Sequence, residues 1–157
     1  MAVRVGMGFD VHAFTDDPDR RLVLGGVEFE GAKGLSGHSD ADVVAHAIAD
    51  ALLGAASLGD LGDHFSDADP EWAGANSLGL LERVVQMVVI GGWRPANVDC
   101  TVVLEAPRLA PQRTAMQERL GAIVGAPVSV KATTAEGLGF IGRNEGVACW
   151  AVALVEA

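Results

Sequence analysis

The spacing of hydrophobic and polar positions predicts alternating strands and helices along this chain. In the first part, Val3 to Ala13 has the composition of a strand, and Leu22 to Phe29 that of a hairpin or bent strand that turns at Gly25-Gly26. The residues between them, Thr15 to Arg21, are rich in Asp and Pro and are typical of a loop. Leu58 to Pro70 is rich in Gly and Asp and is likewise predicted to be an irregular surface loop.

The later part of the chain continues this alternation. We expect helices at Ser77 to Val89 and Pro111 to Val124, and strands at Asn97 to Glu105, Val128 to Thr134 and Gly146 to Val155. The pattern predicts the α/β (α+β) class, with a mixed four-stranded sheet, helices on one face and a small N-terminal hairpin. A length of 157 residues fits one domain, which we take to span residues 1–157.

One predicted helix carries a histidine on its polar face. Ser39 is its expected N-cap, with Asp40 and Asp42 in the first turn, where the helix dipole favours negative charge. Asp42, His46 and Asp50 recur every four residues, so these carboxylates are placed to orient the imidazole of His46. The same stripe is equally typical of a solvated helix face. The apolar face consists of Val44, Ile48, Ala51, Leu52 and Ala55.

The last strand, Gly146 to Val155, is apolar on both faces. Helices of the same chain can cover one face of the sheet. A chain of this length has too few helices to cover the other, so we expect a second subunit there and a homo-oligomer packed sheet against sheet.

Composition and charge narrow the function. The formal net charge is −10 and no Lys/Arg cluster occurs, which argues against nucleic acid or an anionic membrane as partner. A small anionic substrate would need metal ions to neutralise its charge. Cys100 and Cys149 lie in apolar, strand-like runs and are expected to be buried free thiols. The N-terminus lacks a secretory pattern and no apolar stretch is long enough to span a bilayer, so we expect a cytoplasmic protein.

Asp10, His12 and His46 are candidate ligands of one metal ion. Asp10 and His12 alternate on the first strand and therefore share a face, and His46 could supply a third ligand. Two nitrogens and one oxygen with an open position match a catalytic zinc site. A strand-end Asp/His pair that is only hydrogen bonded is the alternative.

A second group of chemically useful residues lies between Val130 and Gly146. Here a strand ends in Thr133 and Thr134, followed by Glu136 and a glycine-rich stretch that could bind phosphate oxygens and a hard cation. The spacing matches neither the dinucleotide fingerprint nor the P-loop. On its own it is also compatible with an ordinary strand and turn.

Together these segments resemble the 2-C-methyl-D-erythritol 2,4-cyclodiphosphate synthase family of the non-mevalonate isoprenoid pathway. The resemblance covers nearly the whole chain, in the family's order and spacing. The matching stretches are Gly8-Phe-Asp-Val-His-Ala-Phe14, Gly37-His-Ser-Asp-Ala-Asp42, His46-Ala47, Asp50 to Ala56, Leu58-Gly-Asp-Leu-Gly62, Asn97-Val-Asp99, Ala106-Pro107, Val130-Lys-Ala-Thr-Thr134, Glu136, Leu138-Gly-Phe140, Gly142-Arg143 and Glu145-Gly146.

The resemblance implies a homotrimer with active sites in clefts between neighbouring subunits and the sheets facing the threefold axis. Such an enzyme, a phosphorus-oxygen lyase, converts 4-diphosphocytidyl-2-C-methyl-D-erythritol 2-phosphate into the cyclic diphosphate and releases CMP. The substrate's own 2-phosphate is the nucleophile, so the protein contributes positioning and charge neutralisation.

The resemblance also implies roles for individual residues. Asp10, His12 and His46 would bind zinc, Glu136 would help hold magnesium or manganese, and His38 and Thr134 would stabilise the transition state. The implied contacts to the erythritol phosphate are Ser39, Asp60, Leu61, Gly62, Phe65, Ser66, Asp67, Ala68 and Asp69. Those to the cytidine end come from the neighbouring subunit and are Leu104, Ala106, Pro107, Ala110 and Thr133; further implied substrate contacts are Ala132, Phe140 and Arg143.

Several positions depart from the family's pattern. Ser66 stands where a proline is common and Gly137 where a lysine often follows the glutamate, but neither change removes an implied ligand. Trp150 stands where a glutamate can occur near the trimer axis, and we therefore do not carry over a polar or isoprenoid-binding central cavity. Arg143 could contact substrate or face the axis, and His64 is expected to be solvated rather than a ligand.

Two other functions use the same residues. A zinc-dependent phosphohydrolase would activate water at the same three ligands and release two acyclic fragments. A non-enzymatic trimer would use the metal only for folding, or would bind an isoprenoid ligand.

Overall fold

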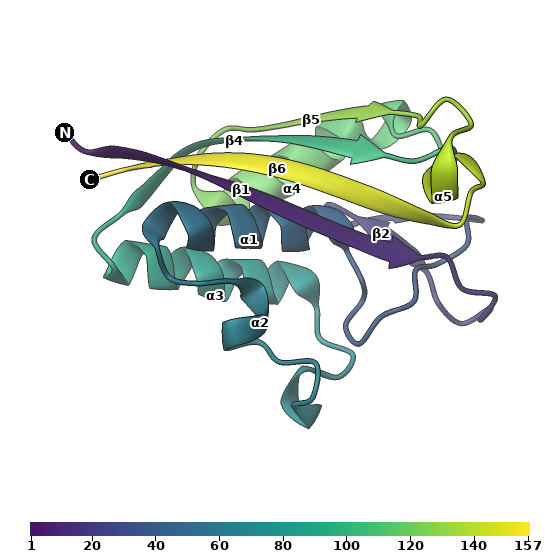
Figure 1. Cartoon of the computed structure of the whole chain (residues 1–157), viewed down its shortest axis with the longest axis horizontal. Helices are drawn as coiled ribbons and strands as arrows, with labels where there is room; N and C mark the ends of the chain where they lie inside the picture. Colours follow the sequence, from purple (N-terminus) through teal and green to yellow (C-terminus); the bar gives the residue numbers. More distant parts are fainter.

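The computed structural model describes residues 1–157 and contains a mixed four-stranded sheet (Figure 1). Its strands are β1 (Val3–Ala13), β4 (Arg94–Val103), β5 (Val128–Thr133) and β6 (Gly146–Glu156). In the order β1-β6-β4-β5, β6 is antiparallel to both of its neighbours, whereas β4 and β5 are parallel. The predicted mixed sheet is confirmed, and β1 and β5 form its opposite edges.

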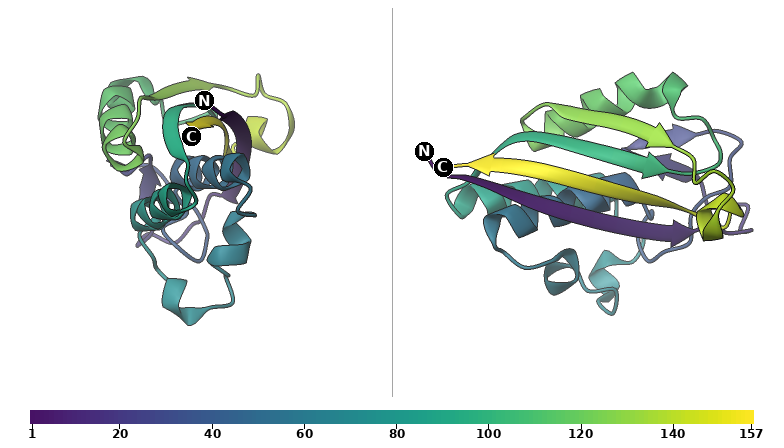
Figure 2. Two further views of the ribbon diagram at one scale, coloured as in Figure 1. Left: turned by 90° about the vertical axis from the view of Figure 1, so that its left-hand side faces the viewer. Right: turned by 45° about the horizontal axis from the view of Figure 1, so that its top comes forward.

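Helices cover one face of this sheet, as the pattern predicts (Figure 2). The long ones are α1 (Val43–Ala56), α3 (Ser77–Ile90) and α4 (Arg113–Val124). The short ones are α2 (Leu61–His64), α5 (Gly139–Gly142) and the 3-10 turns Pro70–Trp72 and Ala110–Gln112. No helix, long or short, has the length and apolar composition needed to cross a membrane. Two short antiparallel strands, β2 (Leu22–Leu24) and β3 (Val27–Phe29), form a separate hairpin.

The contact between β1 and α1 is unusually close because two glycines line it. A Cβ on Gly8 would lie 1.9 Å from the carbonyl oxygen of Ala47, and a Cβ on Gly6 would lie 2.0 Å from that of Ala51. Only glycine permits this approach of helix backbone to strand backbone. Asp10 follows Gly8 on the same face of β1, so its side chain lies beside α1.

The start of α1 differs from the prediction. The helix begins at Val43 and its N-cap is Asp42, so the predicted N-cap at Ser39 is wrong. Asp40 and Asp42 both precede the helix instead of lying in its first turn. The reason is that the carboxylate of Asp42 is the group that accepts from the free backbone N–H groups, at Val44 and Ala45.

Asp42 also ties the hairpin to the helix. Its side chain is fully buried and accepts hydrogen bonds from the backbone N–H of Gly25, at 2.9 Å, and of Gly26, at 2.8 Å. These two glycines form the turn between β2 and β3 with positive φ angles. One carboxylate therefore caps α1 and fixes the hairpin turn against it.

Three further details differ from the prediction. The segment predicted to be irregular contains α2, which a capping box between Asp60 and Asp63 stabilises. Strand β4 ends at Val103 rather than Glu105, and α4 begins at Arg113. Most of the buried hydrophobic residues form one cluster, which includes Cys100 and Cys149; both are buried free thiols, as predicted.

On the sheet face turned away from the helices, the half formed by β1 and β6 is apolar and exposed in the single chain, whereas β4 and β5 carry polar residues such as Asp99 and Lys131 there. The large exposed hydrophobic residues on β1 and β6 are Val3, Val5, Met7, Phe9, Val11, Trp150 and Val152. The rings of Phe9 and Trp150 pack across the two strands with centroids 4.8 Å apart. This surface agrees with the prediction that the last strand, β6, is apolar on both of its faces.

We predict that Gly8→Ala destabilises the protein, because the new methyl group overlaps the backbone of α1. The expected loss is about 3 kcal/mol or more of unfolding free energy in urea denaturation. Gly54→Ala in α1 is the matched control, because nothing lies within 4 Å of its Cβ; there we expect a gain of about 0.5–1 kcal/mol. Equal stabilities for the two variants would contradict the close helix–strand contact.

Candidate metal centre and active-site cleft

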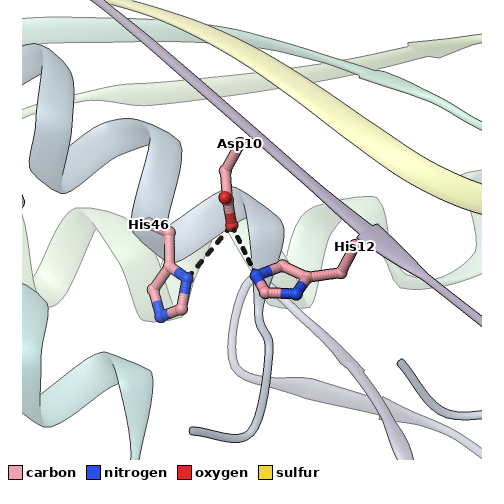
Figure 3. Close-up of side chains that lie close together, drawn as sticks. All are labelled: Asp10, His12 and His46. Carbon is pink, nitrogen blue, oxygen red and sulfur yellow. Dashed lines mark hydrogen bonds and ion pairs between the residues drawn. The ribbon is translucent and has the colours of Figure 1, made fainter. Parts of the chain in front are cut away.

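Asp10, His12 and His46 converge at one point between β1 and α1 (Figure 3). Asp10 Oδ2 lies 3.2 Å from His12 Nε2 and 3.1 Å from His46 Nδ1. One potential ligand atom from each residue lies within 4.8 Å of those of the other two. The predicted grouping of these three residues is thus present in the fold.

The other nitrogen of each imidazole already has a partner. His12 Nδ1 donates to the backbone carbonyl oxygen of Ser36 at 2.7 Å. His46 Nε2 lies 2.8 Å from Ser77 Oγ, at the start of α3. Both rings are therefore oriented with their remaining nitrogen toward Asp10, as is usual for histidines that bind metals.

The electrostatics of the cluster suit a cation. Burial raises the pKa of Asp10, but its hydrogen bonds with His12 and His46 outweigh burial and hold that pKa below the ordinary value. The bond with Asp10 raises the pKa of His12 above its usual range, against the opposing effect of burial. A carboxylate and two imidazoles, each about one quarter exposed or less, fit a zinc ion with an open coordination position.

The three residues lie at the edge of a cleft of about 360 Å³. The predicted catalytic residue His38 lines this cleft, and so do six of the predicted substrate contacts: Ser39, Leu61, Gly62, Phe65, Ser66 and Asp67. Asp60 lines an adjoining cavity of about 350 Å³ together with Asp10 and His46. His38 Nε2 donates to the backbone carbonyl oxygen of Asp69 at 3.2 Å, and this hydrogen bond orients the imidazole in the cleft.

The carboxylates predicted to orient His46 do not do so. Asp42 is occupied by the hairpin turn, and Asp50 accepts a hydrogen bond from the backbone N–H of Leu61 at 3.2 Å. Burial raises the pKa of Asp50. Both carboxylates have the four-residue spacing from His46 that the sequence predicts. Each, however, accepts hydrogen bonds from backbone N–H groups of another segment, and the spacing within the helix does not predict these partners. The alternative of a solvated stripe is also wrong for Asp42, which is fully buried.

Most of the residues predicted to bind the cytidine end, together with Thr134, line a cavity separate from the cleft at the metal ligands. A cavity of about 250 Å³ is lined by Leu104, Pro107, Ala110, Ala132, Thr133 and Thr134, among others. Ala106 lines a neighbouring cavity. Because β1 and β5 are opposite edges of the sheet, about three strand spacings, or roughly 14 Å, separate this group from the metal ligands.

Three further predicted residues follow β5 on exposed positions. Glu136 has a φ of 53° in the turn, Phe140 is 46% exposed, and Arg143 pairs with Glu145 at 2.6 Å. None of the three lines the cavities beside the metal ligands. His64, expected to be solvated, is exposed and donates to the carbonyl oxygen of Leu58 at 2.7 Å.

Sequence reasoning missed several residues of the cleft. Trp72 and Leu80 form part of its wall, and the Trp72 ring packs edge-on against Phe65 with centroids 5.0 Å apart. A large aromatic residue in an otherwise polar, irregular segment was the available signal for Trp72. The sequence contained no signal for a role of Ser77 in the site, because a serine at the start of a helix ordinarily indicates an N-cap.

Comparisons with known proteins match nearly the whole chain to a single family. Residues 3–156 match the model of the YgbB family. The chain is 57% identical to the 2-C-methyl-D-erythritol 2,4-cyclodiphosphate synthase of Symbiobacterium thermophilum, over 96% of this chain and 97% of that protein. It is 56% identical to the bifunctional enzyme IspD/IspF of Anaeromyxobacter dehalogenans, over 98% of this chain and 40% of that protein.

Solved structures give the same result. The bifunctional IspDF of Campylobacter jejuni superposes with a TM-score of 0.93 at 40% identity, over 98% of this chain and 42% of that one. A 2C-methyl-D-erythritol-2,4-cyclodiphosphate synthase described as a CDP-bound form superposes with a TM-score of 0.87 at 33% identity, over 98% of this chain and all of that one.

We predict that the metal-free protein binds one zinc ion per chain and that His46→Ala reduces the affinity by more than about 100-fold, since a ligand is lost rather than an outer partner. Competition with a chromophoric chelator measures this. The affinity should also fall as the pH drops through the raised pKa of His12, because protons then occupy the ligand. His64→Ala is the control and should bind like wild type; equal losses in both variants would contradict the site.

Proposed function

The chain belongs to the YgbB family, that of the 2-C-methyl-D-erythritol 2,4-cyclodiphosphate synthases, and from this membership we infer its reaction. It converts 4-diphosphocytidyl-2-C-methyl-D-erythritol 2-phosphate into 2-C-methyl-D-erythritol 2,4-cyclodiphosphate with release of CMP, in the isoprenoid pathway. The observation in the structure that best supports this reaction is the convergence of Asp10, His12 and His46 beside a polar cleft.

The chemistry requires little covalent participation by the protein. An oxygen of the substrate's 2-phosphate forms a bond to the β-phosphorus, and the bond from that phosphorus to the bridging oxygen breaks, so CMP leaves with the electron pair. No water enters the product, as expected for a phosphorus-oxygen lyase. The chain must therefore bring the two phosphates together and balance their negative charge.

Charge balance explains why metal ligands matter in this protein. The chain has 11 Lys and Arg against 21 Asp and Glu, so its own cations are too few to surround a triphosphorylated substrate. Asp10, His12 and His46 would hold zinc, and Glu136 would help hold magnesium or manganese. Such ions supply positive charge at the phosphate oxygens. His38 and Thr134 are the side chains we assign to stabilising the charge that develops in the transition state.

The remaining predicted contacts divide by position. Ser39, the residues from Asp60 to Gly62 and those from Phe65 to Asp69 belong to the metal-ligand side and are proposed to bind the erythritol phosphate. The segment from Leu104 to Ala110, with Thr133, is proposed to bind the cytidine end. Two of the matched synthases are described as holding CDP, which supports a nucleotide site of this kind.

The distance between these two groups supports active sites shared between subunits. Within one chain they occupy separate cavities at opposite edges of the sheet, whereas the roles proposed for Thr134 and Glu136 require them to reach the same diphosphate as the zinc ligands. The exposed apolar face around Phe9 and Trp150 offers a surface for self-association. We therefore propose a homotrimer in which one copy supplies the metal ligands and its neighbour supplies Thr134 and Glu136. We place it in the cytoplasm, as the sequence leads us to expect.

The products distinguish this reaction from its alternatives. With zinc and magnesium present, we expect CMP and the cyclic diphosphate in equal amounts, and no turnover after chelation, as followed by chromatography and phosphorus NMR. Thr134→Ala should lower turnover by about 100-fold or more while zinc and the oligomer are retained. Acyclic fragments would indicate the phosphohydrolase, and full activity of the Thr134 variant would refute its assigned role.

Mixed oligomers test whether sites are shared. Unfolding and refolding His46→Ala together with Thr134→Ala, each inactive alone, should create some sites with both intact halves. For random mixing around a closed head-to-tail ring, about a quarter of wild-type activity is expected. Each variant refolded alone is the control. Activity that stays at the level of the single variants would show that each chain carries a complete site.

A further inference from the structure

Ser77 has a role in the metal centre beyond starting a helix. It is the first residue of α3, whose N-cap is the side chain of Asn76, so its own side chain is free for other contacts. The residue is 1% exposed. Its Oγ lies 2.8 Å from His46 Nε2 and is hydrogen bonded to the carboxylate of Asp40. Ser39 Oγ lies farther from the same nitrogen, at 3.3 Å.

The carboxylate of Asp40 is fixed in place by backbone groups. It accepts hydrogen bonds from the N–H of Ser77 at 3.1 Å and from the N–H of Asp42 at 3.2 Å. Its own backbone N–H donates to the carbonyl oxygen of Ala75 at 3.1 Å. Asp40 is therefore a preorganised acceptor aimed at the hydroxyl of Ser77.

The direction of these hydrogen bonds follows from the number of protons. A serine hydroxyl has one proton, and a carboxylate can only accept, so the proton of Ser77 points to Asp40. The oxygen of Ser77 then faces His46 Nε2 as an acceptor, and this nitrogen must carry a proton. A neutral imidazole protonated at Nε2 has its lone pair at Nδ1, the atom that faces Asp10 in the metal centre.

We propose that Ser77 and Asp40 are positioning residues that orient His46 and keep its Nδ1 available to the metal ion. They oppose Asp10, whose carboxylate attracts a proton to Nδ1 when no ion is present. This inference rests on the metal site proposed above. It also gives α3 a function, since the first turn of that helix carries the acceptor that fixes a ligand on α1.

Removing the hydroxyl of Ser77 should weaken zinc binding. In Ser77→Ala, His46 loses its acceptor at Nε2, and we expect zinc affinity to fall about 10- to 100-fold in chelator competition. Ser57→Ala is the matched control, because it removes a serine hydroxyl bonded to Arg4 at the other end of α1. This control should bind zinc as wild type does.

Asp40→Asn supplies a second variant that retains the serine. The asparagine amide can donate to Ser77 Oγ and so release the serine proton toward His46 Nε2, the wrong direction for metal binding. Zinc affinity should fall here too, and the double variant should be little worse than Ser77→Ala alone, because both substitutions break one chain of hydrogen bonds. Additive losses would show that the two residues act separately and would overturn the proposal.

Nitrogen NMR of the metal-free protein provides a readout that does not depend on the ion. In the neutral form of wild-type His46 the single ring proton should be on Nε2, and Ser77→Ala should move it toward Nδ1, where Asp10 is then the strongest acceptor. An unchanged proton distribution, or zinc affinity within twofold of wild type, overturns the proposal. Failure of wild type to bind zinc would count instead against the proposed metal site, and the NMR comparison would still decide the role of Ser77.

Discussion

The close contact between β1 and α1 is the constraint on which the site depends. Gly6 and Gly8 bring the carbonyl oxygens of the helix to where a Cβ would otherwise stand. The next residue on that face, Asp10, then lies within hydrogen-bonding distance of His46. A bulkier residue at either glycine would move the helix outward, and a carboxylate and an imidazole 36 positions apart would no longer share an ion.

The surroundings of this contact fix each ligand in turn. Asp42 connects the hairpin turn to the start of α1, the carbonyl group of Ser36 holds His12, and Ser77 holds His46. All of these partners come from segments that are distant in sequence or irregular in structure. The metal centre is therefore a product of the tertiary fold rather than of a local motif, although two of its ligands are neighbours on one strand.

Much of this could be predicted from the sequence, for identifiable reasons. The strands have period-two or continuous apolar patterns, and so the sheet and the shared face of Asp10 and His12 were recoverable. The N-cap at Asp42 could not be predicted, because the hydrogen bonds between its carboxylate and the hairpin turn at Gly25 and Gly26 depend on the tertiary structure. The contacts of Ser77 and Asp40 with His46 could not be predicted for the same reason. The predicted substrate contacts came from the family resemblance rather than from the hydrophobic pattern.

The central claim is that Asp10, His12 and His46 hold one ion that keeps a position open toward the cleft. Anomalous scattering at the zinc absorption edge, from crystals of the zinc-loaded protein, tests it most directly. The account predicts one peak per chain bounded by these three residues, with nitrogen ligands at about 2.0–2.1 Å and a fourth position occupied by water or a phosphate oxygen. A peak elsewhere, or a fourth protein ligand closing the site, would contradict it.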